Sequence, residues 1–340
     1  MTVNQDRFLN PELVTIHPDP AWNGAFTDSR GRFVNQYEPF KTNFKMLLKW
    51  QLFSDNPQKK QKNKDPRKLS FVENPDIFSL KRDAIIWLGH ASFLIRLGGK
   101  TLLTDPVFFE NIVLKRHTPL PFVINDLSGV DYILLSHDHR DHCDEKTIRF
   151  IAEKCPQAQV LTGLRIQELI QPWLRRNEVQ EAAWYQKYRL DEEFEITYVP
   201  ARHWGKRGLF DERKRLWGGF MIRYQGQQIY FMGDSAYDSH FADIREICGS
   251  PDYCIMGVGA YKPEWFMKYS HMNPTDAVRA FKELGGRYFI PMHYGTFDLS
   301  DEPLLEPLDI LKKLNPEGFR ALAIGEPRLL RHETVSPKLL

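Results

Sequence analysis

Four side chains of the kinds that bind divalent metals lie close together in the segment SHDHRDH at 136–142. They are His137, His139, Asp141 and His142, and they follow a predicted buried strand, DYILL at 131–135. Imidazole nitrogens and carboxylate oxygens suit zinc and its divalent neighbours, and loop positions this close can converge on one point. The spacing therefore favours a metal site over a solvated polar loop.

Three further candidates each follow another predicted strand. His203 comes after FEITYVPAR, Asp234 after QQIYFMG and His293 after YFIPM. A lone histidine after a strand is usually structural, so each residue alone is weak evidence. Because all three stand at strand ends, as the SHDHRDH loop does, we predict that the seven residues build one site.

The elements that must position these residues begin near Ala84. Residues 1–75 contain many Pro, Asn and Lys residues and little periodicity, so we predict an N-terminal extension there and a catalytic domain over 76–340. Beyond Ala84, short apolar strands alternate with helices. One helix is predicted from its cap Asn273 to Gly285, and another begins after the cap Asp144. This alternation implies an α/β architecture with helices covering sheets.

The HxHxDH motif, together with PARHWGKR, MGDSAY and PMHYGTF, resembles the metallo-β-lactamase superfamily over about residues 84–330. Within it the chain is similar to the N-acylphosphatidylethanolamine-hydrolysing phospholipase D branch and its bacterial relatives. The segments that carry this similarity are WLGHASFLIRLGGKTLLTDPVF at 87–108, GAYKPEWFMKYSHMNP at 259–274 and HYGTFDLSDEPLLEP at 293–307. The resemblance implies an αββα sandwich of the α/β (α+β) class, with two packed mixed β-sheets, helices outside, and metals in a cleft at one edge.

The resemblance also divides the ligands between two divalent metal ions. It implies one ion held by His137, His139 and His203, a second held by Asp141, His142 and His293, and Asp234 bridging both. We expect Zn²⁺, although iron or manganese fits the same ligands. The loop does not match the oxygen-reducing di-iron relatives, so the resemblance favours hydrolysis over redox chemistry.

The expected reaction is attack on phosphorus. Two divalent cations about 3.5 to 4 Å apart can deprotonate a shared water near neutral pH, which gives a hydroxide nucleophile. We predict Asp141 and His271 as catalytic residues. In the resembled branch the histidine that matches His271 contacts the phosphate, so His271 would stabilise the transferred phosphoryl group or protonate the leaving oxygen. A loop histidine that is hydrogen-bonded to the backbone is the alternative.

Two more residues are candidates for orienting the ligands. A metal-bound imidazole usually donates its other N–H to a carboxylate or carbonyl group. His90 in WLGHAS and Asp105 in LLTDP stand at predicted strand ends that would point toward the cleft. Asp105 precedes Pro106, so a purely turn-forming role is the competing interpretation.

Composition limits the class of protein. The chain has 340 residues, of which 42% are hydrophobic, and a net charge of +2, so we expect a globular enzyme with no nucleic-acid partner. The N-terminus does not match a secretory signal, and no apolar run reaches a membrane span. We therefore expect a cytoplasmic protein, with peripheral contact at the inner face of the membrane as an option. The four cysteines are expected to be reduced thiols.

The substrate is suggested by two apolar features. FKMLLKWQLF at 44–53, with Lys41, Lys45 and Lys49, predicts a basic amphipathic helix that would contact a membrane through residues 41–53 or pack on the core. Six aromatic residues flank the ligand loops and would form either a lipid-binding wall or ordinary packing: Trp184, Trp204, Phe210, Trp217, Trp265 and Phe266.

Three functions are compatible with these observations. The first is a dinuclear phosphodiesterase of the phospholipase D type that acts on N-acylphosphatidylethanolamine-like lipids. The second is a metal-dependent hydrolase or lactonase for a small soluble, phosphorylated substrate. The third is a non-catalytic, metal-stabilised binding protein, against which the complete ligand set argues. A homodimer is expected by family analogy alone.

Overall fold

The computed structural model describes residues 7–39, 46, 49–50, 54–112, 114–191 and 193–330. Two seven-stranded sheets contain most of its strands. The first sheet, in spatial order, consists of β16 (Pro327–Leu329), β4 (Ala84–Gly89), β5 (Ser92–Leu97), β6 (Lys100–Thr104), β7 (Tyr132–Leu135), β8 (Gln159–Gly163) and β9 (Val179–Ala182). The second consists of β15 (Tyr288–Met292), β14 (Tyr253–Gly257), β13 (Gln227–Phe231), β12 (Gly219–Tyr224), β11 (Phe194–Val199), β10 (Gln186–Lys187) and β2 (Val14–Thr15).

Both sheets are mixed. In the first, the strands from β16 to β6 pair antiparallel, and those from β6 to β9 pair parallel. In the second, β13, β14 and β15 are parallel and the remaining pairs are antiparallel. The carboxyl ends of parallel strands lie at the same edge of a sheet, so the loops after β7, β13 and β15 can each deliver side chains to an edge.

Strand alternation produces two core layers. Along β4, Ile85 and Trp87 belong to a large cluster that lies between the sheets and extends to the helices on the second sheet, while Ile86 and Leu88 belong to a second cluster on the outer face of the first sheet. Successive strand residues point to opposite faces, and β4 is apolar throughout because both of its faces are covered. The predicted αββα sandwich is therefore confirmed.

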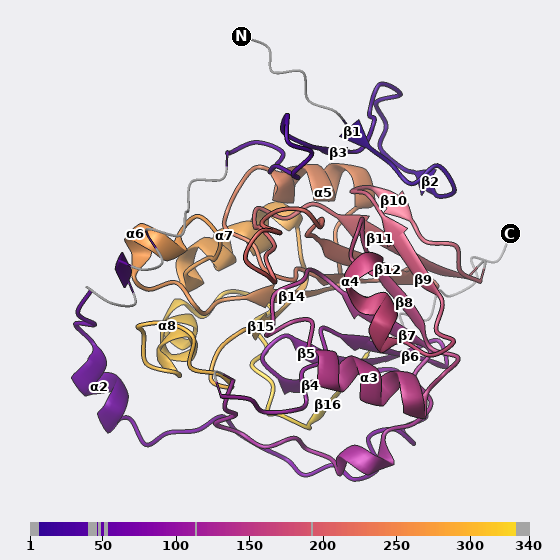
Figure 1. Ribbon diagram of the computed structural model, residues 1–340. Helices are drawn as coiled ribbons and strands as arrows, with labels where there is room; N and C mark the ends of the chain where they lie inside the picture. The colour runs from indigo at the N-terminus through magenta and orange to yellow at the C-terminus, as the bar shows by residue number, and fades with distance from the viewer. Residues whose placement is uncertain are drawn as a thin grey trace, which may run out of the picture.

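Helices cover both outer faces, as Figure 1 shows. The first sheet is covered by α3 (Glu145–Lys154), whose Ile148 and Ile151 join the outer cluster, and by α4 (Gln167–Ile170). The second sheet is covered by α5 (His240–Cys248) and α7 (Pro274–Leu284), with α8 (Glu306–Leu314) and the short α6 (Glu264–Met267) nearby. No helix in the described part of the chain is long and apolar enough to cross a membrane.

The predicted helix ends are confirmed. Asp144 precedes α3 and accepts a hydrogen bond from the Thr147 N–H. Asn273 precedes α7 and accepts from the N–H groups of Thr275 and Asp276, while Gly285 ends that helix with a left-handed conformation at φ 68°. Capping side chains satisfy N–H groups that the first turn leaves without partners. These caps fix where the loops before α3 and α7 end, and both loops contribute to the site.

The N-terminal segment packs on the sandwich. β1 (Arg7–Phe8) pairs with β3 (Ala25–Phe26), β2 forms the edge of the second sheet, and α2 (Lys59–Lys64) follows. Most of the predicted helix at 44–53 lies outside the described residues. Within it, Trp50 donates from Nε1 to Asp301 Oδ1 at 3.1 Å and stacks on Phe266. The predicted domain boundary near residue 75 and the predicted membrane contact of residues 41–53 stay predictions.

Candidate metal centre

The SHDHRDH loop follows β7, the fifth strand of the first sheet, and folds back at once. The backbone N–H groups of His142 and Cys143 both donate to the His139 carbonyl, at 3.1 and 2.8 Å. This turn brings the two ends of the motif together, because i+3 and i+4 hydrogen bonds place those residues over the same spot. All four cysteines are buried thiols, as expected, and burial raises the pKa of Cys143 to about 12.

The seven predicted ligands, with His90 as an eighth residue, come together in two groups. In one, single ligand atoms of His137, His139, His203 and Asp234 lie within 4.8 Å of one another. In the other, ligand atoms of His90, Asp141, His142 and His293 do so. Donor atoms in a shell of this size can contact one cation, and imidazole with carboxylate is the donor set of divalent metal sites.

Asp234 lies between the two groups. Its Oδ2 atom is close to nitrogens from both, namely 3.1 Å from His142 Nε2, 3.3 Å from His293 Nε2, 3.8 Å from His203 Nε2 and 3.9 Å from His137 Nε2. The residue follows β13 and its side chain is only 2% exposed. One carboxylate therefore faces histidines from three loops.

Within the first group, three imidazole nitrogens approach each other directly. His139 Nδ1 lies 3.0 Å from His137 Nε2 and 3.1 Å from His203 Nε2. The opposite nitrogens of two rings are held elsewhere, since His137 Nδ1 contacts Ser136 Oγ at 2.9 Å and His203 Nδ1 lies 2.9 Å from the Ser270 carbonyl. These outer contacts orient the rings with their remaining nitrogens toward a common centre.

Two histidine nitrogens of the donor set have no hydrogen-bond partner, which also fits a bound cation. His142 Nε2 and His293 Nε2 are buried and make no hydrogen bond, although both face the carboxylates of Asp141 and Asp234. A buried polar atom without a partner destabilises a fold by about 1 to 3 kcal/mol. A divalent cation between these atoms and the carboxylates would satisfy both, so the His and Asp clusters fit divalent metal binding.

Electrostatics in the second group follow from the two carboxylates. Burial works against charge on every member, yet the charge of His142 holds the pKa values of Asp141 and Asp234 well below their usual range. In return, and against the effect of burial, Asp234 and Asp141 hold the pKa of His142 well above its ordinary value and raise that of His293 to about 9. Protons on these two imidazoles neutralise the carboxylates when no metal does.

Asp105 is fully buried directly beneath the loop. Its Oδ2 lies 2.8 Å from His142 Nδ1, and its two oxygens accept hydrogen bonds from the Ser136 N–H and hydroxyl group at 2.7 and 2.5 Å. Its backbone has φ 34° and donates to the Leu134 carbonyl, so the residue also forms a turn. The carboxylate contacts go beyond that turn and connect Asp105 to two residues of the motif.

His90 contacts the second group from β4. Its Nε2 lies 3.0 Å from Asp141 Oδ2, and its ring centroid is 4.0 Å from that of His293. Burial, with the charge of His293, lowers the pKa of His90 to about 3, which keeps the imidazole neutral. His90 therefore either orients Asp141 through this contact or, because it belongs to the same 4.8 Å group, offers a nitrogen of its own.

His271 lies on the loop between α6 and α7 and faces the same centre. Its Nδ1 is 3.8 Å from Asp234 Oδ2, and its ring is 5.2 Å from the His203 ring and 5.3 Å from the His293 ring. Burial lowers its pKa to about 4. No side-chain hydrogen bond to the backbone is seen for His271 among the described residues, which disfavours the alternative of a purely structural loop histidine.

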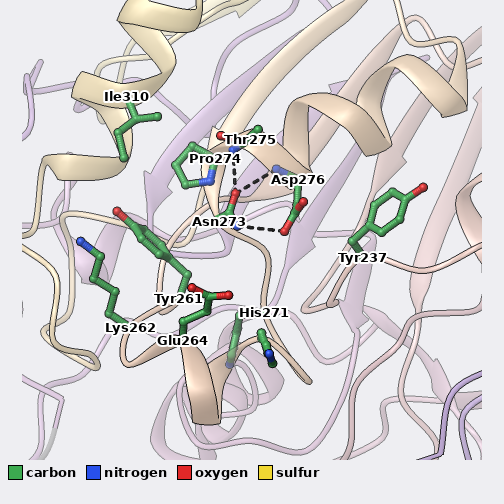
Figure 2. A pocket seen from close by; sticks show the side chains of 11 residues that line it. Tyr237, Tyr261, Lys262, Glu264, His271, Asn273, Pro274, Thr275, Asp276 and Ile310 are labelled. Carbon is green, nitrogen blue, oxygen red and sulfur yellow. Dashed lines mark hydrogen bonds between the residues drawn. The ribbon is translucent and has the colours of Figure 1, made fainter.

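Two clefts open from the centre. The first, of about 510 Å³, lies between α6, α7 and α8, as Figure 2 shows, and His271 is at its inner end. Its walls carry polar and charged groups, including Tyr261, Lys262, Glu264 and Asp276. The second cleft, of about 670 Å³, contains Asp141 and is lined by residues from α3 and from several loops: Ile112, Leu114, Leu299, Arg140, Lys146, Arg149, Arg207, Glu110, Asp144 and Glu145.

Sequence reasoning missed the role of Asp138, which it treated as a variable position of the motif. Its side chain is buried, and its Oδ2 lies 2.6 Å from Arg215 Nε. Arg215 also pairs with Asp211, and Arg207 donates from Nη1 to the Cys143 carbonyl at 2.6 Å. These contacts join the SHDHRDH loop to the loop after His203. Nothing in the spacing of the sequence identifies Arg215 as the partner.

The six aromatic candidates divide between packing and exposure. Trp184 and Trp217 are fully buried, and Trp184 donates from Nε1 to the Trp217 carbonyl at 2.7 Å, so both belong to the core. Trp204 lies beside the His139 ring, with centroids 4.8 Å apart. Phe210, by contrast, is 87% exposed. A lipid-binding wall is therefore limited to the residues that remain near the surface.

The comparisons with known proteins identify the family. A family model described as a beta-lactamase superfamily domain matches residues 100–294, which contain all seven predicted ligands. The chain belongs to the metallo-β-lactamase superfamily. It is a metal-dependent hydrolase. The predicted family, fold and enzyme class are confirmed.

Relatives within the superfamily agree with the predicted branch. The chain is 32% identical to the N-acyl-phosphatidylethanolamine-hydrolyzing phospholipase D 1 of Caenorhabditis elegans, over 87% of this chain and 88% of that protein. It is 32% identical to the mitochondrial enzyme of the same description from Saccharomyces cerevisiae, over 68% of this chain and 52% of that protein. The solved metallo hydrolase Igni18 from Ignicoccus hospitalis is 20% identical, with a TM-score of 0.57 over 74% of this chain and all of that one, which shows the shared fold.

Proposed function

We propose that the chain is a dinuclear phosphodiesterase of the phospholipase D type that acts on N-acylphosphatidylethanolamine-like lipids. The observation that carries the proposal is the convergence of four ligand histidines on Asp234 Oδ2, at 3.1 to 3.9 Å. A carboxylate shared by two groups of donors suits two cations that act on one phosphate. The substrate class is supported by similarity to the Caenorhabditis elegans phospholipase over 87% of this chain.

The proposed ligands divide as the two groups do. His137, His139 and His203 would hold one ion, Asp141, His142 and His293 would hold the other, and Asp234 would contact both. We propose Zn²⁺, because histidine and carboxylate oxygen are its usual ligands, with iron or manganese as the alternatives that metal analysis would detect. Two such ions would supply a water that is deprotonated near neutral pH and positive charge beside the phosphate.

The chain's own residues would position the metal ligands and protonate the substrate. Asp105 would hold the His142 ring by accepting its Nδ1 proton, which leaves Nε2 directed at the centre. His90 would hold Asp141 by donating from Nε2 to its Oδ2. His271, with its neutral imidazole at the inner end of the polar cleft, would direct an N–H at the phosphoryl group or the leaving oxygen. Asp141 and His271 are thus the two catalytic residues that we propose.

The decisive experiment measures lipid turnover by protein whose metal content is known. N-acylphosphatidylethanolamine in mixed micelles is incubated with wild type and with His139→Ala, and phosphatidic acid is quantified. The proposal expects turnover by wild type with about two metals per chain, and loss of turnover in the variant. Metal-loaded wild type that leaves the lipid intact but cleaves soluble phosphodiesters or lactones would refute the lipid assignment and favour a hydrolase of small substrates.

A further inference from the structure

Three large apolar side chains near the metal centre face solvent instead of the core. Ile112, Leu209 and Phe210 are 94%, 82% and 87% exposed, and they are the most exposed large apolar residues in the described part of the chain. Exposed apolar side chains are ordinary when scattered, but a group of them beside a site marks a surface for interaction. Their position relative to the centre therefore decides whether they have a shared role.

The two segments that carry them border one cleft. Ile112 and Arg207 both line the cleft that contains Asp141, and Leu209 and Phe210 follow Arg207 closely in the chain. The Arg207 carbonyl lies 3.4 Å from Arg140 Nη2, which ties the second segment to the SHDHRDH loop. Asp211 Oδ1 accepts from the N–H groups of Arg207 and Gly208, at 3.1 and 2.7 Å, and closes a tight turn. Leu209 and Phe210 form the tip of that turn.

Positive charge accompanies the apolar tips. Arg140, Lys146 and Arg149 line the same cleft and are exposed. Four carboxylates line the same cleft, and each is engaged within the protein. Asp141 faces the ligand histidines, Asp144 caps α3, Glu145 pairs with Arg149 at 2.8 Å, and Glu110 accepts from the Arg116 N–H at 2.8 Å. Neither Arg140 nor Lys146 forms an ion pair with a described residue. Apolar side chains flanked by unpaired cations complement the interface of a bilayer that contains anionic lipids.

From these observations we propose that the tips Ile112, Leu209 and Phe210, with Arg140 and Lys146, dock this enzyme on an anionic phospholipid surface. Docking there would turn the cleft that contains Asp141 toward the bilayer, so a phospholipid would reach the metal centre without crossing bulk water. The choice of a lipid surface as the occupant rests on the proposed function. The residues of this surface differ from residues 41–53, for which membrane contact was predicted from the sequence.

Sedimentation with vesicles tests the surface without any turnover. Zinc-loaded full-length chain is mixed with phosphatidylcholine vesicles that contain or lack about 30% phosphatidylglycerol, at low and high salt. The double variant Leu209→Glu/Phe210→Glu and the single variant Ile112→Glu are compared with Val14→Glu. Val14 is a suitable control because it is also exposed, at 69%, but lies on β2 at the far edge of the other sheet. Circular dichroism melting verifies that each variant is folded.

The expected result is salt-sensitive binding that favours the anionic vesicles. The partition coefficient falls at least about tenfold in the double variant and in Ile112→Glu, because each places a charge at the interface, and stays within about twofold in Val14→Glu. Wild type that stays in the supernatant, or folded variants that pellet as wild type does, would overturn the proposal. A change in oligomeric state by light scattering, with vesicle binding intact, would instead make this surface an interface between copies and also overturn it.

The outcomes separate docking from the proposed reaction. If the chain binds vesicles through Leu209 and Phe210 but leaves N-acylphosphatidylethanolamine intact in mixed micelles, the docking surface is supported and the proposed substrate is refuted. If the chain cleaves the lipid in micelles but its binding to vesicles is unchanged by the substitutions at Ile112, Leu209 and Phe210, the proposed reaction is supported and the docking surface is refuted.

Discussion

Asp105 Oδ2 lies 2.8 Å from His142 Nδ1, and neither side chain is exposed to solvent. Asp105 follows β6, and His142 lies in the SHDHRDH loop, which follows β7. Because β6 and β7 pair in parallel, the segments that follow these two strands lie side by side. The contact fixes which nitrogen of His142 remains for the centre. An outer carboxylate of this kind raises the basicity of a metal-bound imidazole as well as orienting it.

Asp105→Asn should therefore weaken metal binding more than it weakens the fold. An amide cannot accept the His142 Nδ1 proton with the strength of a carboxylate, so we expect zinc affinity to fall about 10- to 100-fold. Competition with a chromogenic chelator measures this. Asp131→Asn is the matched control, since Asp131 accepts a backbone hydrogen bond from Thr101 at 2.8 Å in the same sheet but lies outside both ligand groups. Equal affinities for the two variants would contradict the positioning role of Asp105.

His271→Ala should reduce turnover and leave metal content unchanged. The ring lines the polar cleft, where we propose that the phosphoryl group binds, and removal of a positioned acid or hydrogen-bond donor typically lowers kcat about 10²- to 10⁴-fold. Metal analysis and kinetics on the same protein sample distinguish a loss of catalysis from a loss of bound metal. His117→Ala is the control, because His117 is exposed and belongs to neither ligand group. Full turnover by His271→Ala with intact metal content would show that the residue is not catalytic.

Metal binding should release protons at neutral pH. In the metal-free protein, the pKa of His293 is raised to about 9 and that of His142 lies well above its ordinary value, so both imidazoles carry protons at pH 7. A metal must displace them, so we expect release of about two protons per loaded chain and an affinity that falls as pH falls below 9. Calorimetric titration with zinc in buffers of different ionisation enthalpy counts the protons. The count should decrease in His293→Ala, and a count near zero in wild type would contradict these pKa shifts.

Arg215→Met should lower the free energy of unfolding strongly. It leaves the fully buried Asp138 carboxylate without its partner, a change that typically costs about 3 to 5 kcal/mol. Urea denaturation measures it. Arg189→Met is the comparison, because Arg189 pairs with Glu12 at 2.9 Å while both side chains are 65% exposed, and such pairs contribute about 1 kcal/mol or less.

A double variant separates the charge from the packing around it. Asp138→Leu combined with Arg215→Met removes both charges, so it should be less destabilised than Arg215→Met alone. The single variant Asp138→Leu completes the comparison. A loss of stability in the double variant that equals the sum of the losses in the two single variants would show that the two residues are not coupled. Zinc affinity is measured beside stability, since the pair joins the SHDHRDH loop to the loop after His203.

Much of the fold was predictable because it follows from local rules. Asp144 and Asn273 cap the helices that were expected from them, and the strands predicted before His137, Asp234 and His293 exist with their carboxyl ends at those residues. Capping depends on a few neighbouring residues, and strand periodicity on the next two or four. Neither depends on what the rest of the chain does.

The partners of these residues were not predictable in the same way. Asp138 occupies a position where the motif allows any residue, and its contact with Arg215 spans 77 positions of the chain. The exposure of Leu209 and Phe210 depends on a turn closed by Asp211, whereas Trp184 and Trp217, which the sequence equally allowed near the surface, are buried between the sheets.

The sequence by itself determined the donor types, their spacing in the SHDHRDH loop and their places at strand ends, because ligand chemistry and local periodicity are written in neighbouring residues. Only the tertiary structure decided that Asp234 contacts both donor groups, that Asp105 orients His142, and that the segments of Ile112 and Arg207 meet at the cleft of Asp141. Those relations depend on the register and packing of two sheets, where each contact is made between distant segments and many pairings are chemically equivalent until the chain has folded.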